Sequence, residues 1–399
     1  MPRPHEKSGD RPYDIVLFGA TGFVGELTAQ YLAAHAPEGC RWALAGRTPA
    51  KLELLRERLA KTDPACAELP LLRADSGDPA SLRELARSTR VLASTVGPYL
   101  THGQALVAAC AEAGTDYTDL TGEPEFVDRM YLGYDAVARR TGARLVHACG
   151  FDSVPHDLGA YFTVRQLPEG VPLRVDGFVR TGARFSGGTF ASALGAMGRG
   201  RQMLRAARER RAVEPGPVGA RRARAVPGTP HRSREVGAWA VPLPTIDAQV
   251  VARSAAALER YGPDFRYRHY AAVKRLPVAA GGALAVGSVV ALAQIPAARR
   301  WLGSLVAPGT GPDEATRAKS WFTVRFVGEG GGKRVFTEVS GGDPGYGETA
   351  KILAESLLCL AFDELPPTAG QVTTAAAMGD ALLERLQGAG IRFRVAHTE

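Results

Sequence analysis

The chain has 399 residues, of which 45% are hydrophobic and 23% are charged, and its formal net charge is +8. This composition excludes an intrinsically disordered chain, and the length suggests two domains or one large one. The sequence has five cysteines, Cys40, Cys66, Cys110, Cys149 and Cys359. Because they are odd in number and far apart, they exclude a disulfide framework and a zinc site and indicate reduced thiols in a cytoplasmic protein. Residues 1–12 are polar and lack the apolar segment of a secretory signal, so we expect a flexible tail there.

The first motif follows directly on an apolar run of strand length at residues 13–18. GATGFVG has glycines at spacings of three and leads into a helical stretch. Gly19 would allow a sharp turn, Gly22 would let the backbone approach a pyrophosphate, and Gly25 would let the helix lie close on the strand. The pattern predicts a dinucleotide site, with a glycine-rich turn of another α/β protein as the alternative. The expected phosphate-binding residues are Gly19, Ala20, Thr21, Gly22, Phe23, Val24 and Gly25.

The second expected strand, residues 40–45, indicates which dinucleotide is bound. An NAD site usually carries Asp or Glu at the end of this strand, to hold the ribose 2′-hydroxyl. Here the strand ends in Gly46 and Arg47, and a guanidinium suits a 2′-phosphate. We therefore predict NADP(H). The alternative is that Arg47 is a solvated residue beside the helix cap at Thr48.

Strands and helices continue to alternate up to residue 150, which predicts a Rossmann-type, doubly wound parallel sheet and an α/β fold class. The expected strands are 69–74, 91–96, 116–119 and 144–148, and the expected helices are 48–61, 104–113 and 125–140. Asp75, at the end of the third strand, is expected near the adenine. After the fourth strand, small residues are expected to leave room for the nicotinamide; the segment is Thr95, Val96, Gly97 and Pro98.

Four motif blocks occur together along the chain. They are GATGFVG (19–25), TVGPY (95–99) with YTDLTGE (117–123), GFDSVPHDLG (150–159) and GDPGYGETAKILAESLLCLA (342–361). In this combination the chain resembles the saccharopine dehydrogenase-like oxidoreductases, and most closely the branch that includes trans-acting enoyl reductases of polyketide-lipid biosynthesis. The resemblance implies an NADP-binding domain at 13–150 and an inserted α+β domain at 151–345 for substrate binding and dimerisation. It also implies C-terminal helices at 346–399 that return to the first domain.

The resemblance implies a small-molecule substrate and NADP(H)-dependent hydride transfer. The leading hypothesis is enoyl reduction of an apolar, lipid-like or polyketide-derived substrate. A saccharopine-type reaction on an imine or amino acid is one alternative. A non-catalytic dinucleotide-binding scaffold at lipid surfaces is the other.

Reduction requires a proton donor near the nicotinamide, at the carboxyl ends of the strands. The candidates placed there are Tyr99, His102, Tyr117, Asp119, Glu123, Asp152 and His156. Each has a structural alternative: Asp152 could cap the following helix, Tyr99 could pack in its loop, and Asp119 could hold backbone amides. No Tyr-x-x-x-Lys pair follows the fourth strand, which argues against the proton relay of short-chain dehydrogenases. We predict no metal site.

Two later segments are unusual in charge. Residues 199–234 hold 11 Arg against two Glu and read as a mobile basic loop, so the rest of the chain is close to neutral. Residues 276–298 carry no charge. We consider three alternatives for them: a membrane-associated or lipid-binding helix, a buried core or dimer helix, and a membrane-spanning helix. The Gly- and Ala-rich segment 187–198 could line the substrate cleft or belong to a closely packed helix pair. No aromatic interleaving supports nucleic-acid binding.

Overall fold

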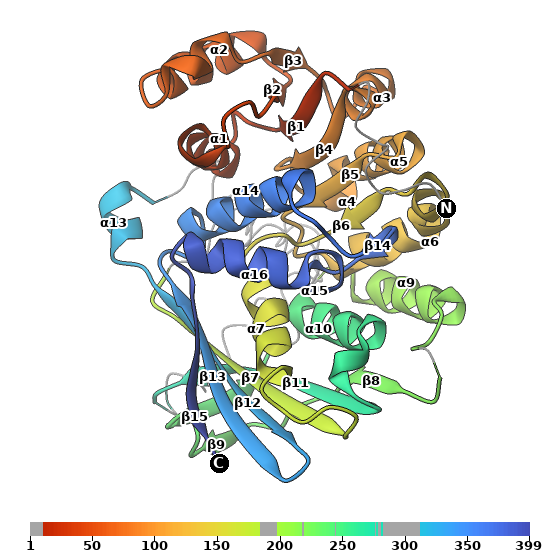
Figure 1. Ribbon diagram of the computed structural model, residues 1–399, viewed down its shortest axis with the longest axis vertical. Coiled ribbons are helices and arrows are strands. Elements are labelled where there is room, and N and C mark those ends of the chain that lie inside the picture. Colours follow the sequence, from red (N-terminus) through yellow and green to blue (C-terminus); the bar gives the residue numbers. More distant parts are fainter. Residues whose placement is uncertain are drawn as a thin grey trace.

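The molecule contains two β-sheets with helices between and around them (Figure 1). This computed structural model describes residues 11–183, 198–217, 219–243, 245–275, 277, 281 and 312–399. The first sheet has seven strands in the order β14-β6-β5-β4-β1-β2-β3, and every pair in it is parallel. The strands are β1 (Tyr13–Phe18), β2 (Trp42–Gly46), β3 (Leu71–Arg73), β4 (Thr89–Ser94), β5 (Asp116–Asp119), β6 (Arg144–Val146) and β14 (Gly370–Val372). The predicted Rossmann-type doubly wound sheet is confirmed, and its strand order reverses between β1 and β4.

Both faces of the first sheet are covered, as its apolar strands require. Side chains alternate along β1, so Ile15 and Leu17 enter one core cluster while Val16 and Phe18 enter another on the opposite face. The helices of the alternating region are α1 (Phe23–His35), α2 (Pro49–Leu59), α3 (Pro79–Ser88), α4 (Tyr99–His102), α5 (Gln104–Ala113) and α6 (Pro124–Thr141), and a short 3-10 turn, η2 (Pro64–Glu68), precedes β3. Helix α1 packs against a helix from the C-terminal part, α14 (Gly347–Phe362).

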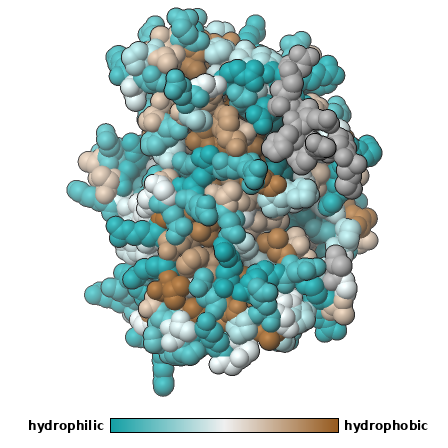
Figure 2. Space-filling model, in the orientation of Figure 1, coloured by the Kyte–Doolittle hydropathy of each residue, from teal (hydrophilic) through white to brown (hydrophobic). Residues whose placement is uncertain are grey.

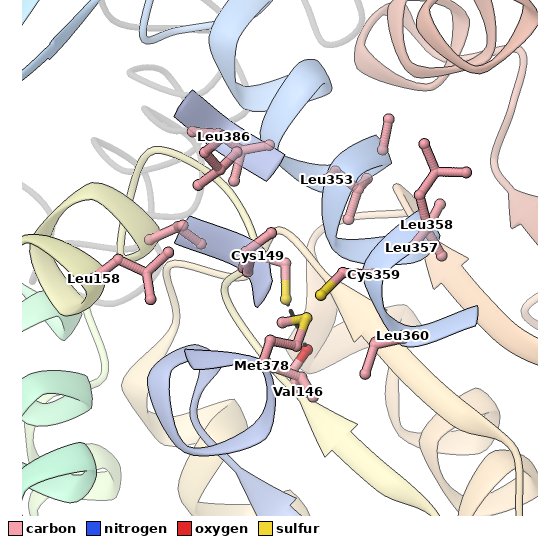
Figure 3. Packing of buried hydrophobic residues seen from close by; sticks show 14 of the residues in the cluster. Val146, Cys149, Leu158, Leu353, Leu357, Leu358, Cys359, Leu360, Met378 and Leu386 are labelled. Carbon is pink, nitrogen blue, oxygen red and sulfur yellow. Dashed lines mark hydrogen bonds between the residues drawn. The ribbon is translucent and has the colours of Figure 1, made fainter. Parts of the chain in front are cut away.

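Two C-terminal helices, α14 and α15 (Thr374–Ala377), pack against the first sheet (Figure 3). The third, α16 (Gly379–Gly388), packs on α14 and α15. Cys149, which follows β6, lies in the same cluster as Cys359 of α14 and Met378 (Figure 3). All five thiols are free, as the scattered spacing predicted. The last strand, β15 (Arg392–Thr398), instead joins the second sheet.

The second sheet follows the order β15-β13-β12-β7-β11-β10-β9, with β8 paired beside β11. Its strands are β7 (Leu173–Thr181), β8 (Arg222–Ala225), β9 (His231–Ser233), β10 (Ala238–Pro242), β11 (Asp264–Val273), β12 (Phe322–Gly330), β13 (Lys333–Gly341) and β15. Helices α7 (Val154–Val164) and α10 (Ile246–Ala257) pack on it, and a 3-10 turn, η3 (Glu259–Tyr261), precedes β11. Both helices also contact α15, so they join the two sheets. Strands β12 and β13 form a hairpin in this sheet.

The basic segment 199–234 is not a loop, so this prediction is wrong. It contains a helix, α9 (Gly200–Val213), as well as β8 and β9. Arg210 is buried and pairs with Asp128 of α6 and with Glu214, while Arg199 pairs with Glu125. Arg221 donates to backbone carbonyls at the end of α10. The carboxylates of α6 pair with Arg199 and Arg210, and these ion pairs hold α9 against α6.

Three predicted segments lie partly or wholly outside the described residues. Arg11, at the end of the expected tail 1–12, donates to Thr89 O and Ala113 O, so the tail is held from this residue onward. Segment 187–197 and all but two positions of 276–298 lie outside the described residues. Among the described helices, none is both long and apolar enough to span a bilayer. On the face that Figure 2 shows, apolar groups are scattered among hydrophilic ones.

Candidate active site

The glycine motif forms a tight turn between β1 and α1. Gly19 has a φ of +84°, and a Cβ built on Gly25 would lie 2.2 Å from the carbonyl oxygen of Gly19. Gly22 caps α1 without a side-chain hydrogen bond, and the amides of residues 23–25 donate to no acceptor among the described residues. Thr95 fixes the turn from β4, because its hydroxyl donates to Gly19 O at 3.0 Å. The turn therefore offers free amides and an open approach, which fits the pyrophosphate of a dinucleotide.

The carboxyl end of β2 supplies the second part of this site. Arg47 follows Gly46 directly, and its side chain is exposed with no carboxylate partner in the described parts of the chain. Gly46 pairs with Arg73 at the end of β3, so a second exposed arginine lies at the same edge. Asp75 uses one carboxylate oxygen to accept from the amide of Gly77 at 2.9 Å. Free guanidinium groups at this edge fit a ribose 2′-phosphate.

Tyr99 and Glu123 have structural hydrogen bonds at the carboxyl end of β4. The Tyr99 hydroxyl donates to Ser94 O at 3.0 Å and accepts from the amide of Leu120 at 3.1 Å. Burial raises the pKa of Tyr99 well above its ordinary value. The Glu123 carboxylate accepts from the amides of Tyr99 and Leu100. These side chains shape the loop, and a hydroxyl bonded to backbone on both sides is poorly placed to donate a proton to substrate.

Asp119 joins the loops that follow β5 and β6. It is fully buried, and its carboxylate accepts from the amides of Thr121 and Ala148. Its second oxygen lies 2.6 Å from Nδ1 of His147. Ala148 has a positive φ of 60°, a conformation rare for a residue with a side chain. Asp119 therefore stabilises a strained loop at the sheet edge. This is the structural role, holding backbone amides, that the sequence predicted as its alternative.

Two further candidates lie at opposite extremes of burial. Tyr117 is fully buried in the core on one face of the first sheet. His102 is exposed, with Nδ1 3.5 Å from Ser76 Oγ. Tyr117 is therefore closed off from substrate, whereas His102 lies beside the segment after β3.

Asp152 lies in the loop after β6, at the carboxyl edge of the first sheet. Its side chain is partly exposed, and no hydrogen bond joins it to another described residue. Its Oδ2 would lie 3.4 Å from a Cβ built on Gly122, so the carboxyl group faces the loop after β5. Burial, together with the nearby carboxylate of Asp247, raises the pKa of Asp152 to about 7. A carboxyl group with this pKa holds a proton it can release near neutral pH.

Buried polar side chains of α7, α10 and β11 lie behind Asp152. His156 Nδ1 is 3.1 Å from Asp247 Oδ1, and His269 Nε2 is 3.6 Å from Asp247 Oδ2. The two imidazole rings meet edge to face at 4.9 Å. Burial lowers the pKa of His156 to about 3 and that of His269 to about 4, and it raises the pKa of Asp247. The two histidines are therefore neutral at pH 7.

Two motifs that lie far apart in sequence meet at this edge. The amide of Phe151 donates to Thr349 Oγ1 at 3.1 Å, and Thr349 Oγ1 donates to Pro344 O. Asp343 accepts from the amide of Gly347 at the start of α14. Phe151 also packs edge to face on Phe322 of β12, with ring centroids 4.9 Å apart. The GFDSVP and GDPGYG blocks thus hold each other and set the position of Asp152.

Sequence reasoning missed Asp247 and His269. Neither lies in a motif block, and Asp247 lies in the first turn of α10, where acidic residues are common. The alternation of β11 would have placed His269 on the same sheet face as Tyr267, which is buried and hydrogen-bonded to it at 3.0 Å. That alternation is the signal that could have found it.

A separate groove of about 630 Å³ lies at the opposite edge of the first sheet, lined by residues such as Tyr13, Cys40 and Cys66. The free amides, Arg47 and Asp152 are all at the carboxyl edge, where doubly wound sheets bind their ligands. We therefore place the site at the carboxyl edge. Among the described residues, no cluster of His, Cys, Asp or Glu could hold a metal ion.

Known proteins with similar sequences and folds agree with this geometry. Residues 15–146 match the family model described as the saccharopine dehydrogenase NADP binding domain. A Mycobacterium tuberculosis (strain ATCC 25618 / H37Rv) protein provisionally named a trans-acting enoyl reductase is 40% identical over 416 aligned residues, covering 96% of this chain and 97% of the relative. The trans-acting enoyl reductase of Mycobacterium bovis (strain BCG / Pasteur 1173P2) is 37% identical, with 96% and 97% covered.

One solved structure shows the same fold. Saccharopine dehydrogenase (L-Glu forming) from Saccharomyces cerevisiae superposes with a TM-score of 0.57 at 11% identity, covering 96% of this chain and 100% of that chain. At this low identity the similarity concerns the fold alone, and no substrate is inferred from it.

Proposed function

Because the chain belongs to the saccharopine dehydrogenase-like family, in the branch of the trans-acting enoyl reductases, we propose that it reduces the carbon–carbon double bond of an apolar, lipid-like or polyketide-derived enoyl substrate. It is an NADP(H)-dependent oxidoreductase. One observation carries the proposal for the site: the free amides of α1, the exposed Arg47 and the partly exposed Asp152 all lie at one edge of the first sheet.

The residues at this edge fit the cofactor. The glycine turn and the amides of residues 23–25 would hold the pyrophosphate, and Arg47 would hold the 2′-phosphate. When bound, NADPH supplies the hydride. The protein's own contributions are to orient the substrate, to exclude water and to provide a proton for the second carbon of the double bond.

Asp152 is our candidate for that proton. Its carboxyl group has no hydrogen-bond partner among the described residues, and it faces the loop after β5. Glu123 joins that loop to the one after β4, where the nicotinamide is expected. Tyr99, Asp119 and Glu123 are bonded to backbone amides and would keep this loop in shape. The buried carboxyl group of Asp247 favours the protonated form of Asp152 through charge repulsion.

The cofactor preference is tested by Arg47→Ala. Loss of a charge-assisted, bidentate contact is expected to weaken NADPH binding about 10- to 100-fold and to leave NADH binding nearly unchanged. Titration of cofactor fluorescence measures both affinities, and Lys51→Ala on the exposed side of α2 is the matched control. Equal weakening of both cofactors by Arg47→Ala would contradict the assignment.

The two alternative functions can be distinguished from enoyl reduction by the substrates with which NADPH is consumed. A saccharopine-type enzyme would oxidise NADPH with imines of amino acids, and a scaffold would bind NADPH without consuming it. We expect NADPH consumption with enoyl substrates, and we expect it to increase as the acyl chain becomes longer and more apolar. A panel of enoyl, keto and imine compounds, followed by absorbance of the reduced nicotinamide, distinguishes the three.

Peripheral attachment to a membrane is a second proposal, with lipid biosynthesis as its setting. It rests on the uncharged sequence 276–298. The arginines of 199–234 support it less than their number suggests, because Arg199, Arg210 and Arg221 are used inside the protein. Flotation with anionic liposomes tests the proposal, and protein that stays at the bottom of the gradient would end it.

A further inference from the structure

The dinucleotide loop carries no basic side chain of its own. Residues 19–26 contain no Lys or Arg, and their charged member, Glu26, pairs with Arg58 at 2.9 Å. The free amides of α1 can accept an anion, but a pyrophosphate would bring two negative charges to a turn that offers only dipoles. A cation at this place has to come from elsewhere in the chain.

A short helix of the C-terminal part reaches the loop. Helix α13 (Glu314–Ala318) precedes β12, and its N-terminus is capped by Asp313, whose carboxylate accepts from the amide of Thr316 at 2.8 Å. Its Arg317 guanidinium lies over the ring of Phe23, 5.4 Å from the centroid. Phe23 is the first residue of α1, so its own amide belongs to the phosphate-binding turn.

The Phe23 ring is fixed from a second side. Tyr346, in the GDPGYG block, packs edge to face on it with ring centroids 4.7 Å apart. Phe23 is thus held between Tyr346 and Arg317 while its amide remains free. The ring provides a platform that keeps the guanidinium beside the turn.

The N–H groups of the Arg317 guanidinium are available to bind a ligand. Its side chain is partly exposed, and no ion pair or side-chain hydrogen bond joins its guanidinium to another residue in the described ranges. This distinguishes it from Arg199, Arg210 and Arg221, whose guanidinium groups have partners inside the protein. A planar cation that is pre-oriented by an aromatic ring, and has free N–H groups, is suited to a phosphate.

We propose that Arg317 completes the pyrophosphate site, donating from across the loop to the phosphates that the amides of α1 hold from below. The inference rests on the NADP(H) part of the proposed function and not on the identity of the substrate. It makes cofactor binding depend on a residue that precedes β12 of the second sheet. Bound cofactor would therefore tie α13 and β12 to the first sheet.

The test compares ligands with and without a pyrophosphate. Arg317→Ala is expected to weaken NADPH binding about tenfold, as loss of a charge-assisted contact does, and to leave the affinity for adenosine 2′-monophosphate unchanged. Arg47→Ala is expected to weaken both ligands. Arg317→Lys keeps the charge without the planar fork and should be intermediate. Lys319→Ala, an exposed neighbour just past α13, is the matched control.

Calorimetry or fluorescence titration gives these dissociation constants without turnover, and circular dichroism checks that each variant is folded. Unchanged NADPH binding by folded Arg317→Ala would overturn the inference, and so would equal weakening of both ligands. Failure of the enoyl panel with NADPH binding intact would overturn only the proposed substrate. A variant that fails to fold leaves Arg317→Lys to decide, because wild-type NADPH affinity in that variant would contradict a bidentate contact.

Discussion

Replacing Asp152 with Asn is expected to lower kcat for reduction by about 10²- to 10⁴-fold, the usual contribution of a positioned general acid. Asn has the shape of Asp but no proton to release at this pKa. NADPH affinity should stay within about twofold of wild type, because the phosphate-binding residues lie on other loops. Asp78→Asn is the control, since that side chain caps α3 on the surface and Asn preserves the cap.

The pH profile distinguishes a proton donor from a structural residue. Burial and Asp247 raise the pKa of Asp152 to about 7, so the acid form dominates below pH 7 and is lost above it. The kcat of wild type should therefore fall as pH rises through about 7, and this limb should be absent from Asp152→Asn. Asp247→Asn removes the repelling carboxylate and should move the limb to lower pH. An unchanged alkaline limb in Asp152→Asn would remove Asp152 from this role.

Asp128→Ala is expected to lower the free energy of unfolding by about 3 kcal/mol or more. Asp128 is buried on α6 and accepts from Arg210 of α9 and from Arg253 of α10. Removing it leaves Arg253 without its carboxylate partner and leaves the buried Arg210 with Glu214 alone. Arg253 keeps 20% of its side chain exposed, so water can solvate part of its unpaired charge. We therefore expect a destabilisation close to the lower bound of about 3 kcal/mol.

An exposed ion pair on α9, the helix that carries Arg210, gives the comparison. Glu209 pairs with Arg205 one turn away on α9, where both side chains are largely exposed. Glu209→Ala should change the free energy of unfolding by no more than about 0.5 kcal/mol. Urea denaturation followed by circular dichroism measures both variants. Equal, small effects would mean that α9 is not held by its buried arginine.

The parts of the fold that could be predicted have local signals. The turn at Gly19–Gly25 follows from glycine spacing, and the strands β1 and β4 follow from short apolar runs bounded by turns. Their parallel order follows because strands and helices alternate. Helix α5 was predicted with its observed bounds, since Gly103 and Gly114 frame it.

The parts that could not be predicted depend on partners far away in sequence. The arginines of α9 read as a loop because their carboxylate partners, such as Asp128 for Arg210, lie about 80 residues earlier. Asp247 and Arg317 were not identified from the sequence, since nothing local shows that one lies between two histidines and the other over Phe23. Charge composition alone cannot tell a solvated arginine from one whose guanidinium has a partner inside the fold.

The central claim, that this protein transfers hydride from NADPH to an enoyl double bond, is tested most directly by isotope transfer. The wild-type protein is incubated with NADPH deuterated at C4 of the nicotinamide and with enoyl thioesters of increasing chain length, and the products are analysed by mass spectrometry. The account predicts a saturated product carrying one deuterium at a carbon of the former double bond, with Asp152→Asn forming it far more slowly. Deuterium found only in reduced imine or carbonyl products, with the enoyl thioesters recovered unchanged, would contradict it.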